Sequence, residues 1–207
     1  ATAFQYTGEK KYAHKAAVIL DRIADVYPEM DLTPYSKMDL YNSHGSSGKG
    51  KIKGCIWETG VGKTLASIYD MIYPGMADDA ALVQFLSGKS SEWKISNDKS
   101  GLSKIRENIE DNILREIILA CKDGKIRGNE GMTQGAMATA AVVLNDVKET
   151  PLALDWLFEP GKRGEGGGHI PAVFIGEVDR DGVGNEASPS YSFGWMSNFR
   201  QCASVLE

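Results

Sequence analysis

The stretch LSKIRENIEDNILREIILACK, residues 102–122, decides the fold class of this chain. Apolar side chains recur in it at every third or fourth position: Leu102, Ile105, Ile109, Ile113, Ile117 and Cys121. Residues at this spacing lie on one face of an α-helix. Gly124 stands where a left-handed helix cap is expected. The stretch therefore predicts a long amphipathic helix that buries one face.

Helical spacing also predicts helices on both sides of this stretch. They cover residues 9–27, 58–73, 78–86, 129–144, 150–158 and 188–207. Residues 129–144 are rich in Ala and Met, which favours burial between other helices. In the last helix, Ser188 is the expected N-cap and Pro189 the first helical residue. The buried stripe of that helix is expected to consist of Tyr191, Trp195, Phe199, Cys202 and Leu206.

The connecting segments contain little sign of β-structure. Only residues 170–175 form a short apolar run that could be extended. Two loops, residues 28–54 and 161–187, are long and rich in Gly or Ser. The sequence thus predicts an all-α fold, arranged either as an incomplete α/α toroid of antiparallel helical hairpins or as an irregular bundle.

Composition and charge exclude several classes of protein. With 207 residues, 42% hydrophobic and 25% charged, the chain is expected to fold as one domain. A net charge of −5 argues against a nucleic-acid binder, which needs clustered Lys and Arg. The apolar runs are far shorter than the roughly 20 residues that span a bilayer. The three cysteines show no metal-ligand spacing and are expected to be buried free thiols.

The sequence GVGKT, residues 60–64, resembles part of a phosphate-binding loop. That loop requires a glycine five residues before the glycine of its G-K-[ST] end, where this chain has Trp57, and it follows a buried strand. The preceding GKGKIKGCIWE is charged and rich in glycine. We therefore expect the start of a helix near Glu58 and Thr59, and no nucleotide site.

Few residues could serve as acids or bases. His14 is expected on a helix surface, whereas His44 and His169 belong to the long loops, where either a surface position or a functional role is plausible. No cluster has the spacing of metal ligands, so neither a metal nor another cofactor is expected.

Two predicted helix starts carry most of the polar residues. DRDGVGNEASPSYSFGW, residues 179–195, brings Asp181, Asn185 and Glu186 ahead of Tyr191. GNEGMTQGA, residues 128–136, presents Asn129, Glu130 and Gln134 at the start of the other helix. The N-termini of helices favour anions. These two helix starts could converge on one anionic ligand.

At this point the sequence resembles the heparinase II/III-like polysaccharide lyases. The opening YTGEKKYAHKAAVIL, the segment GNEGMTQGAMATAAVVLND and above all RDGVGNEASPSYSFGW carry the resemblance. The last of these is similar to the D-G-x-x-x-E-x-S-P-x-Y segment of that family. The resemblance covers most of the chain.

The resemblance implies an α/α toroid that cleaves uronic-acid polysaccharides by β-elimination in a secreted or periplasmic bacterial enzyme. Residues 1–207 would be one toroid segment of a larger protein, without the β-sandwich domain that normally follows and supplies a histidine. Asn129 corresponds to the residue that neutralises the uronate carboxylate. Tyr191 corresponds to the residue that transfers the proton.

The chemistry of β-elimination suits these residue types. An enolate forms when the proton next to the carboxylate leaves, so neutral donors such as Asn stabilise it. A tyrosine must ionise to act as a base, and cations lower its pKa. Arg163 and Arg180 are candidates for this role. The residues expected to bind substrate are His44, Trp57, Gln134, His169, Arg180, Asn185 and Glu186.

Two alternatives remain open. Two carboxylates in one cleft, Glu186 and Asp181, would suit a glycoside hydrolase built on an α/α toroid. The chain could also be a non-catalytic glycan-binding or structural helical module. The tryptophans Trp57, Trp156 and Trp195 are expected either to stack on sugar rings or, more simply, to pack in the core.

Overall fold

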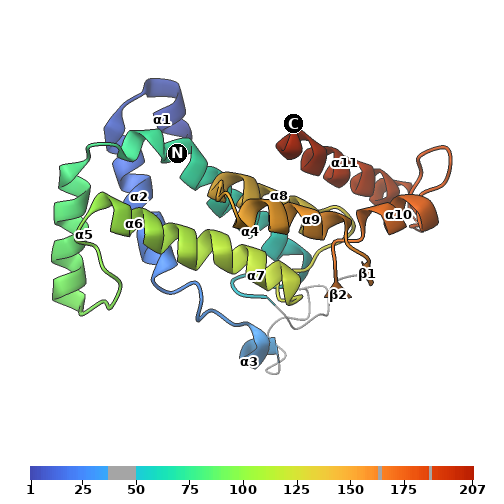
Figure 1. Ribbon diagram of the computed structural model, residues 1–207, viewed down its shortest axis with the longest axis horizontal. Coiled ribbons are helices and arrows are strands. Elements are labelled where there is room, and N and C mark those ends of the chain that lie inside the picture. Colours follow the sequence, from blue (N-terminus) through green and yellow to red (C-terminus); the bar gives the residue numbers. More distant parts are fainter. Residues whose placement is uncertain (37–49, 163–164, 187) are drawn as a thin grey trace. The chain divides into compact units, whose positions relative to one another are not determined.

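The computed structural model describes residues 1–36, 50–162, 165–186 and 188–207. Helices dominate it, as Figure 1 shows. Within these ranges the β-structure is limited to an antiparallel pair of two-residue strands, β1 (Gly161–Lys162) and β2 (Glu165–Gly166), and an isolated bridge between Val178 and Gly184. The prediction of an all-α fold is confirmed. The toroidal arrangement of the hairpins stays a prediction.

The chain divides into two compact units. The first unit comprises Ala1–Met30 and Thr64–Glu116, and the second comprises Asp31–Lys63 and Ile117–Glu207. The boundaries between them fall inside helices as well as in loops, because α4 (Cys55–Ile72) contributes residues to both units.

The first unit is built around α2. Its elements are α1 (Thr2–Thr7), α2 (Lys10–Ala24), the second half of α4, η1 (Pro74–Met76), α5 (Ala80–Trp93), α6 (Leu102–Ile109) and the π-helical turn η2 (Glu110–Arg115). The helix α2 packs against α5, α6 and η1 through its small and apolar residues. Gly75 lets η1 approach closely, because a Cβ there would lie 2.5 Å from the Cβ of Ala13.

The stretch that decided the fold class is helical throughout. It forms α6, η2 and then α7 (Glu116–Lys122), and all four of its stripe isoleucines are fully buried. The π-helical turn in its middle was not predicted. One wide turn of this kind shifts the helical phase locally, which the three-and-four spacing of apolar residues does not reveal.

The second unit surrounds α8 (Met132–Leu144). Its other elements are α3 (Thr33–Ser36), the first half of α4, α7, α9 (Glu149–Asp155), η3 (Trp156–Phe158), α10 (Ile170–Gly176) and α11 (Pro189–Leu206). Every residue of α8 from Thr133 to Ala141 is buried, since α9, η3 and α11 pack around it. The predicted burial of the Ala-rich helix is confirmed.

Several boundaries differ from those expected. Residues 170–175, expected to be extended, form α10, in which Pro171 occupies the first turn and only Val173 is buried. Pro at a helix start is favourable because no N–H is needed there. The helix α4 begins at Cys55 rather than near residue 58, α5 continues to Trp93, and α9 begins at Glu149.

The sequence GVGKT lies inside α4, as the failed loop pattern indicated. The glycine- and lysine-rich segment before it binds a carboxylate of the chain itself. Oε2 of the buried Glu58 accepts four backbone N–H groups, from Lys51 at 3.2 Å, Ile52 at 2.9 Å, Lys53 at 2.7 Å and Gly54 at 3.0 Å. Successive N–H groups of this kind form an anion-binding concavity. Here Glu58 fills that concavity.

Cys121 and Cys202 are buried free thiols, as expected. Burial raises the pKa of Cys121 to about 12. Burial also raises the pKa of Cys202, although nearby Lys63 opposes the shift. Of the helices described, none has both the length and the apolar character needed to cross a bilayer.

Candidate functional site

Three of the residues predicted to carry chemistry, Asn129, Gln134 and His169, lie around the first turn of α8, in the second unit. Gly131 begins this turn with a left-handed backbone, φ +82°, which favours glycine. A Cβ at Gly131 would lie 2.6 Å from the Cβ of Asn198 on α11. The close contact between α8 and α11 therefore requires a glycine here.

Gln134 holds this turn together. Its Oε1 accepts the N–H of Gly131 at 2.9 Å, and its Nε2 donates to the carbonyl of Gly168 at 2.9 Å. The side chain is buried, with 2% of the residue exposed. Both ends of the amide thus serve the fold. Its predicted contact with substrate stays a prediction.

A buried acid–base pair lies beside this amide. Nε2 of His169 is 3.3 Å from Oε2 of Glu130, and the two side chains are 7% and 1% exposed. His169 was expected either on the loop surface or in a functional role, and the structure excludes the surface position. Glu130 was absent from the predicted site. The two residues are far apart in sequence, so only their glycine-rich neighbours, Gly128, Gly131 and Gly166–Gly168, hinted at a close approach.

The backbone around His169 has a restricted conformation. His169 itself is left-handed, with φ +45°, which is uncommon for a residue with a Cβ. The glycine before it, Gly168, allows no side chain, because a Cβ there would lie 2.6 Å from the Cα of Leu157 in η3. Such backbone conformations persist where the surrounding packing enforces them, often at functional sites. The loop therefore holds the imidazole against Glu130.

A small cavity of about 10 Å³ adjoins this pair. Its lining consists of Gly128, Glu130, Thr133, Gln134, Trp156, Gly167, Gly168 and His169. This volume is about that of one water molecule and far below that of a sugar ring. A sugar ring therefore does not fit beside the Glu130–His169 pair.

Asn129 lies at the edge of the same turn and is half-buried. Its carbonyl accepts the N–H of Met132 at 2.9 Å. The next residue joins the turn to α11, because Nδ2 of Asn198 donates to the carbonyl of Glu130 at 3.2 Å. The segment that contains Asn129 is therefore bonded directly to α11.

Tyr191 lies in the first turn of α11 and is 59% exposed. It is two helical turns, roughly 10 Å, before Asn198 on the same face. Its predicted place in the buried stripe is wrong. The stripe consists of Ser192, Trp195, Phe199 and Cys202, and the predicted Leu206 is 39% exposed. The spacing of Trp195, Phe199 and Cys202 continues back to Ser192 rather than to Tyr191. Ser192 can be buried because its hydroxyl is hydrogen-bonded.

The segment before α11 folds onto that stripe. The hydroxyl of Ser192 donates to the carbonyl of Gly184 at 2.8 Å, and a Cβ at Gly184 would lie 2.8 Å from the Trp195 ring. Asp181 closes a turn by accepting the N–H of Val183 at 3.2 Å. Three predicted residues lie on this segment, with Arg180 and Asn185 exposed and Glu186 half-buried.

The remaining predicted residues are distributed more widely. Trp57 is 54% exposed on the first turn of α4, whereas Trp156 and Trp195 are core residues, as the simpler interpretation held. The first turn of α4 also approaches the α8 turn, since a Cβ at Gly128 would lie 3.0 Å from Cγ2 of Thr59. His44 and Arg163 lie outside the described residues.

No three His, Cys, Asp or Glu side chains of the described ranges gather as a metal ion would require. Comparison of the chain with models of known protein families, with curated proteins and with solved structures found no match.

Proposed function

We propose that the chain is a polysaccharide lyase that cleaves a uronic-acid-containing anionic glycan by β-elimination. The observation that best supports this proposal is the hydrogen bond from Asn198 of α11 to the carbonyl of Glu130, 3.2 Å long. It joins the turn that contains Asn129 to the helix that begins near Tyr191. The proposed carboxylate-binding residue and the proposed proton-transfer residue thus belong to two elements that are bonded to each other.

The proposed reaction uses Tyr191 as base and then as acid. Its ionised phenol takes the C5 proton of the uronate, and the electrons of that bond delocalise into the carboxylate as an enolate. When the C4–O bond breaks, the electrons form the C4=C5 double bond, and the phenol returns a proton to the leaving oxygen. The exposure of Tyr191 suits contact with a polymer, because a buried phenol could not reach the sugar.

Asn129 is the proposed donor to the uronate carboxylate. A neutral amide stabilises the developing charge without adding a charge of its own, and the helix dipole at the start of α8 favours an anion by about 0.3–1 kcal/mol. Glu130 and His169 act as positioning residues in this proposal. Their buried pair holds the turn on which Asn129 lies, and the pair itself does not contact the sugar.

The test is to incubate the 207-residue chain, and any longer natural form that contains it, with heparan-type, alginate-type and polygalacturonate polymers. A lyase produces an unsaturated uronate that absorbs in the ultraviolet, and Asn129→Ala should lower its rate more than its glycan binding. New reducing ends without this absorbance would instead support a hydrolase that uses Glu186 and Asp181. Binding without any cleavage would support a glycan-binding module.

A further inference from the structure

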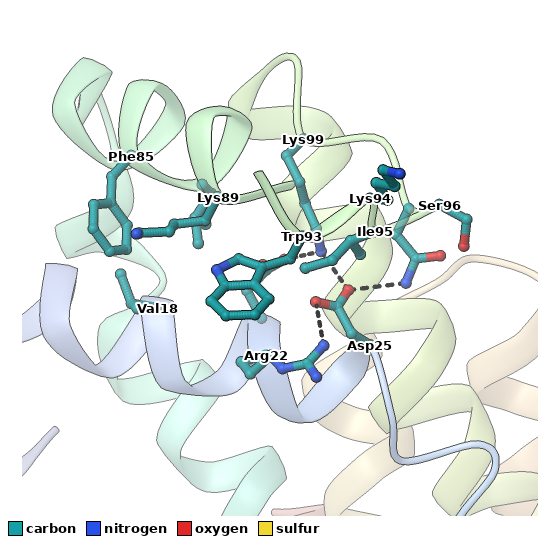
Figure 2. Close-up of a pocket in the computed structure, with 13 residues that line it drawn as sticks. Val18, Arg22, Asp25, Phe85, Lys89, Trp93, Lys94, Ile95, Ser96 and Lys99 are labelled. Atoms are coloured by element: carbon teal, nitrogen blue, oxygen red, sulfur yellow. Dashed lines mark hydrogen bonds and ion pairs between the residues drawn. The ribbon is translucent and has the colours of Figure 1, made fainter. Parts of the chain in front are cut away.

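A second cavity lies within the first unit and contains none of the residues of the proposed lyase site. Its volume is about 670 Å³, which is in the range of small-molecule binding sites, roughly 300–1,000 Å³. Residues of α2, the second half of α5 and the loop at positions 94–99 line it, as Figure 2 shows.

The floor of this cavity is a buried charge network. Nζ of Lys99 lies 2.6 Å from Oδ1 of Asp21 and 2.7 Å from Oδ1 of Asp25, and all three side chains are at most 2% exposed. Arg22 adds a contact of 3.5 Å to the other oxygen of Asp25, and Asn97 donates to Asp25 at 2.9 Å. The two cations, Lys99 and Arg22, balance the two carboxylates of Asp21 and Asp25. The floor therefore needs no further counterion.

The wall formed by the loop at positions 94–99 is fixed by hydrogen bonds. The hydroxyl of Ser90 donates to the carbonyl of Ile95 at 3.0 Å, and that of Ser87 donates to the carbonyl of Lys99 at 2.6 Å. The backbone reverses at Lys94, whose φ of +54° ends α5 in a left-handed turn. Because these bonds hold the loop in place, binding requires little further ordering of it.

The rim combines aromatic surface with positive charge. Trp93 is 70% exposed and Phe85 is 44% exposed. Figure 2 shows the Trp93 indole in the middle of the lining residues, with Phe85 and Lys89 on one side and Asp25 on the other. Counting the floor, the lining holds four cations and only two carboxylates, since Lys89 and Lys94 add to Arg22 and Lys99. Lys89 also has an exposed ion pair of 2.6 Å with Glu92, which does not line the cavity, so a bound carboxylate would share Lys89 with Glu92.

From this juxtaposition we propose that the cavity binds a carboxylate attached to a ring that has an apolar face. The ring stacks on Trp93, because aromatic side chains favour flat apolar surfaces. The carboxylate meets the rim cations Lys89 and Lys94, because Arg22 and Lys99 are already paired with the two aspartates of the floor. Two sources supply this chemistry, a uronic-acid residue of a glycan and a free aryl carboxylic acid. Binding here does not depend on the reaction proposed for the other unit.

The experiment is a titration followed by the indole N–H resonances of the four tryptophans in nitrogen-15 NMR spectra. The probes are digalacturonate, phenylacetate and the neutral phenylacetamide. We expect a saturable shift of the Trp93 resonance, assigned with Trp93→Phe, with a Kd below about 1 mM for at least one acid. The exposed Trp57 serves as the internal control and should not move. A shift with only one acid identifies the source of the ligand.

Charge is tested with a double variant, Lys89→Gln with Lys94→Gln. It should weaken acid binding at least about tenfold, because long-range and direct attraction to the carboxylate are both reduced. The control is Lys11→Gln with Lys15→Gln, which removes two exposed lysines of α2 that do not line the cavity. The proposal is overturned if neither acid moves the Trp93 resonance, if phenylacetamide binds as well as phenylacetate, or if both double variants weaken binding equally.

Discussion

Replacing Lys99 by Met should strongly destabilise the first unit. The ammonium group is 1% exposed and lies 2.6 Å and 2.7 Å from the carboxylates of Asp21 and Asp25. Its removal leaves two buried carboxylates with too little positive charge, and breaking a buried ion pair in this way costs about 3–5 kcal/mol. That is a large part of the roughly 5–15 kcal/mol that stabilises a typical domain.

The loss should depend on pH in a defined direction. Burial is the main cause that raises the pKa of Asp21 above its usual value, although Lys99 opposes the shift. A carboxyl whose pKa is higher in the folded state stabilises the fold below its unfolded pKa, and this contribution is lost as the pH rises through the folded pKa. In Lys99→Met, protonation of Asp21 removes one unpaired charge. The deficit should therefore be smaller near pH 4 than at pH 7.

The assay is urea unfolding followed by circular dichroism at both values of pH. Lys104→Met is the matched control, because Lys104 is exposed on α6 and pairs with Glu107 on the surface. We expect no measurable change in that control. Adding Asp21→Asn to Lys99→Met should recover part of the loss. A loss for Lys99→Met at pH 7 no greater than in the control would refute the reasoning.

Three further predictions concern stability and reactivity. Gly168→Ala should lower the urea midpoint, because a Cβ would clash with η3. Gly194→Ala, on an open face of α11, should instead raise the free energy of unfolding by about 0.5–1 kcal/mol. Equal effects of the two changes would contradict the described loop. Glu58→Gln should lower the free energy of unfolding by about 1–3 kcal/mol, since four backbone N–H groups lose a charged acceptor. Glu107→Gln, at an exposed position, should leave the urea midpoint unchanged. Similar midpoints for both variants would argue against the hydrogen-bonded carboxylate of Glu58. Cys121, with its pKa raised to about 12 by burial, should resist iodoacetamide at pH 8 until urea is added, as peptide mass spectrometry would show; rapid labelling of folded protein would contradict its burial.

The helices could be predicted because their signals are local. The isoleucine stripe of residues 102–122 and the Ser188–Pro189 start of α11 depend on neighbours a few positions away, and the structure has both. The same local rules failed at residues 170–175. Their β-branched residues favour a strand, but Pro171 fits the first turn of a helix, and no partner strand is present among the described residues.

The candidate site could be predicted only in part. Asn129, Gln134 and His169 do gather at the start of α8, since helix starts and glycine-rich loops are recognisable in sequence. The pairing of Glu130 with His169 depends on how residues 167–169 fold onto η3, which no local pattern encodes. The cavity beside Trp93 escaped prediction for a similar reason. Lys99 is far in sequence from Asp21 and Asp25, which lie at the end of α2, and the three form a network only after packing.

The most direct test of the proposed function is the formation of unsaturated uronate by the Tyr191→Phe variant. This change removes only the hydroxyl that the proposed reaction needs, from an exposed side chain whose loss leaves the core intact. Tyr6→Phe, which alters another exposed tyrosine, is the control. The proposal predicts that ultraviolet-absorbing product forms with the unaltered chain and with Tyr6→Phe, and that Tyr191→Phe binds the same polymer but forms none. Full product formation by Tyr191→Phe would contradict it.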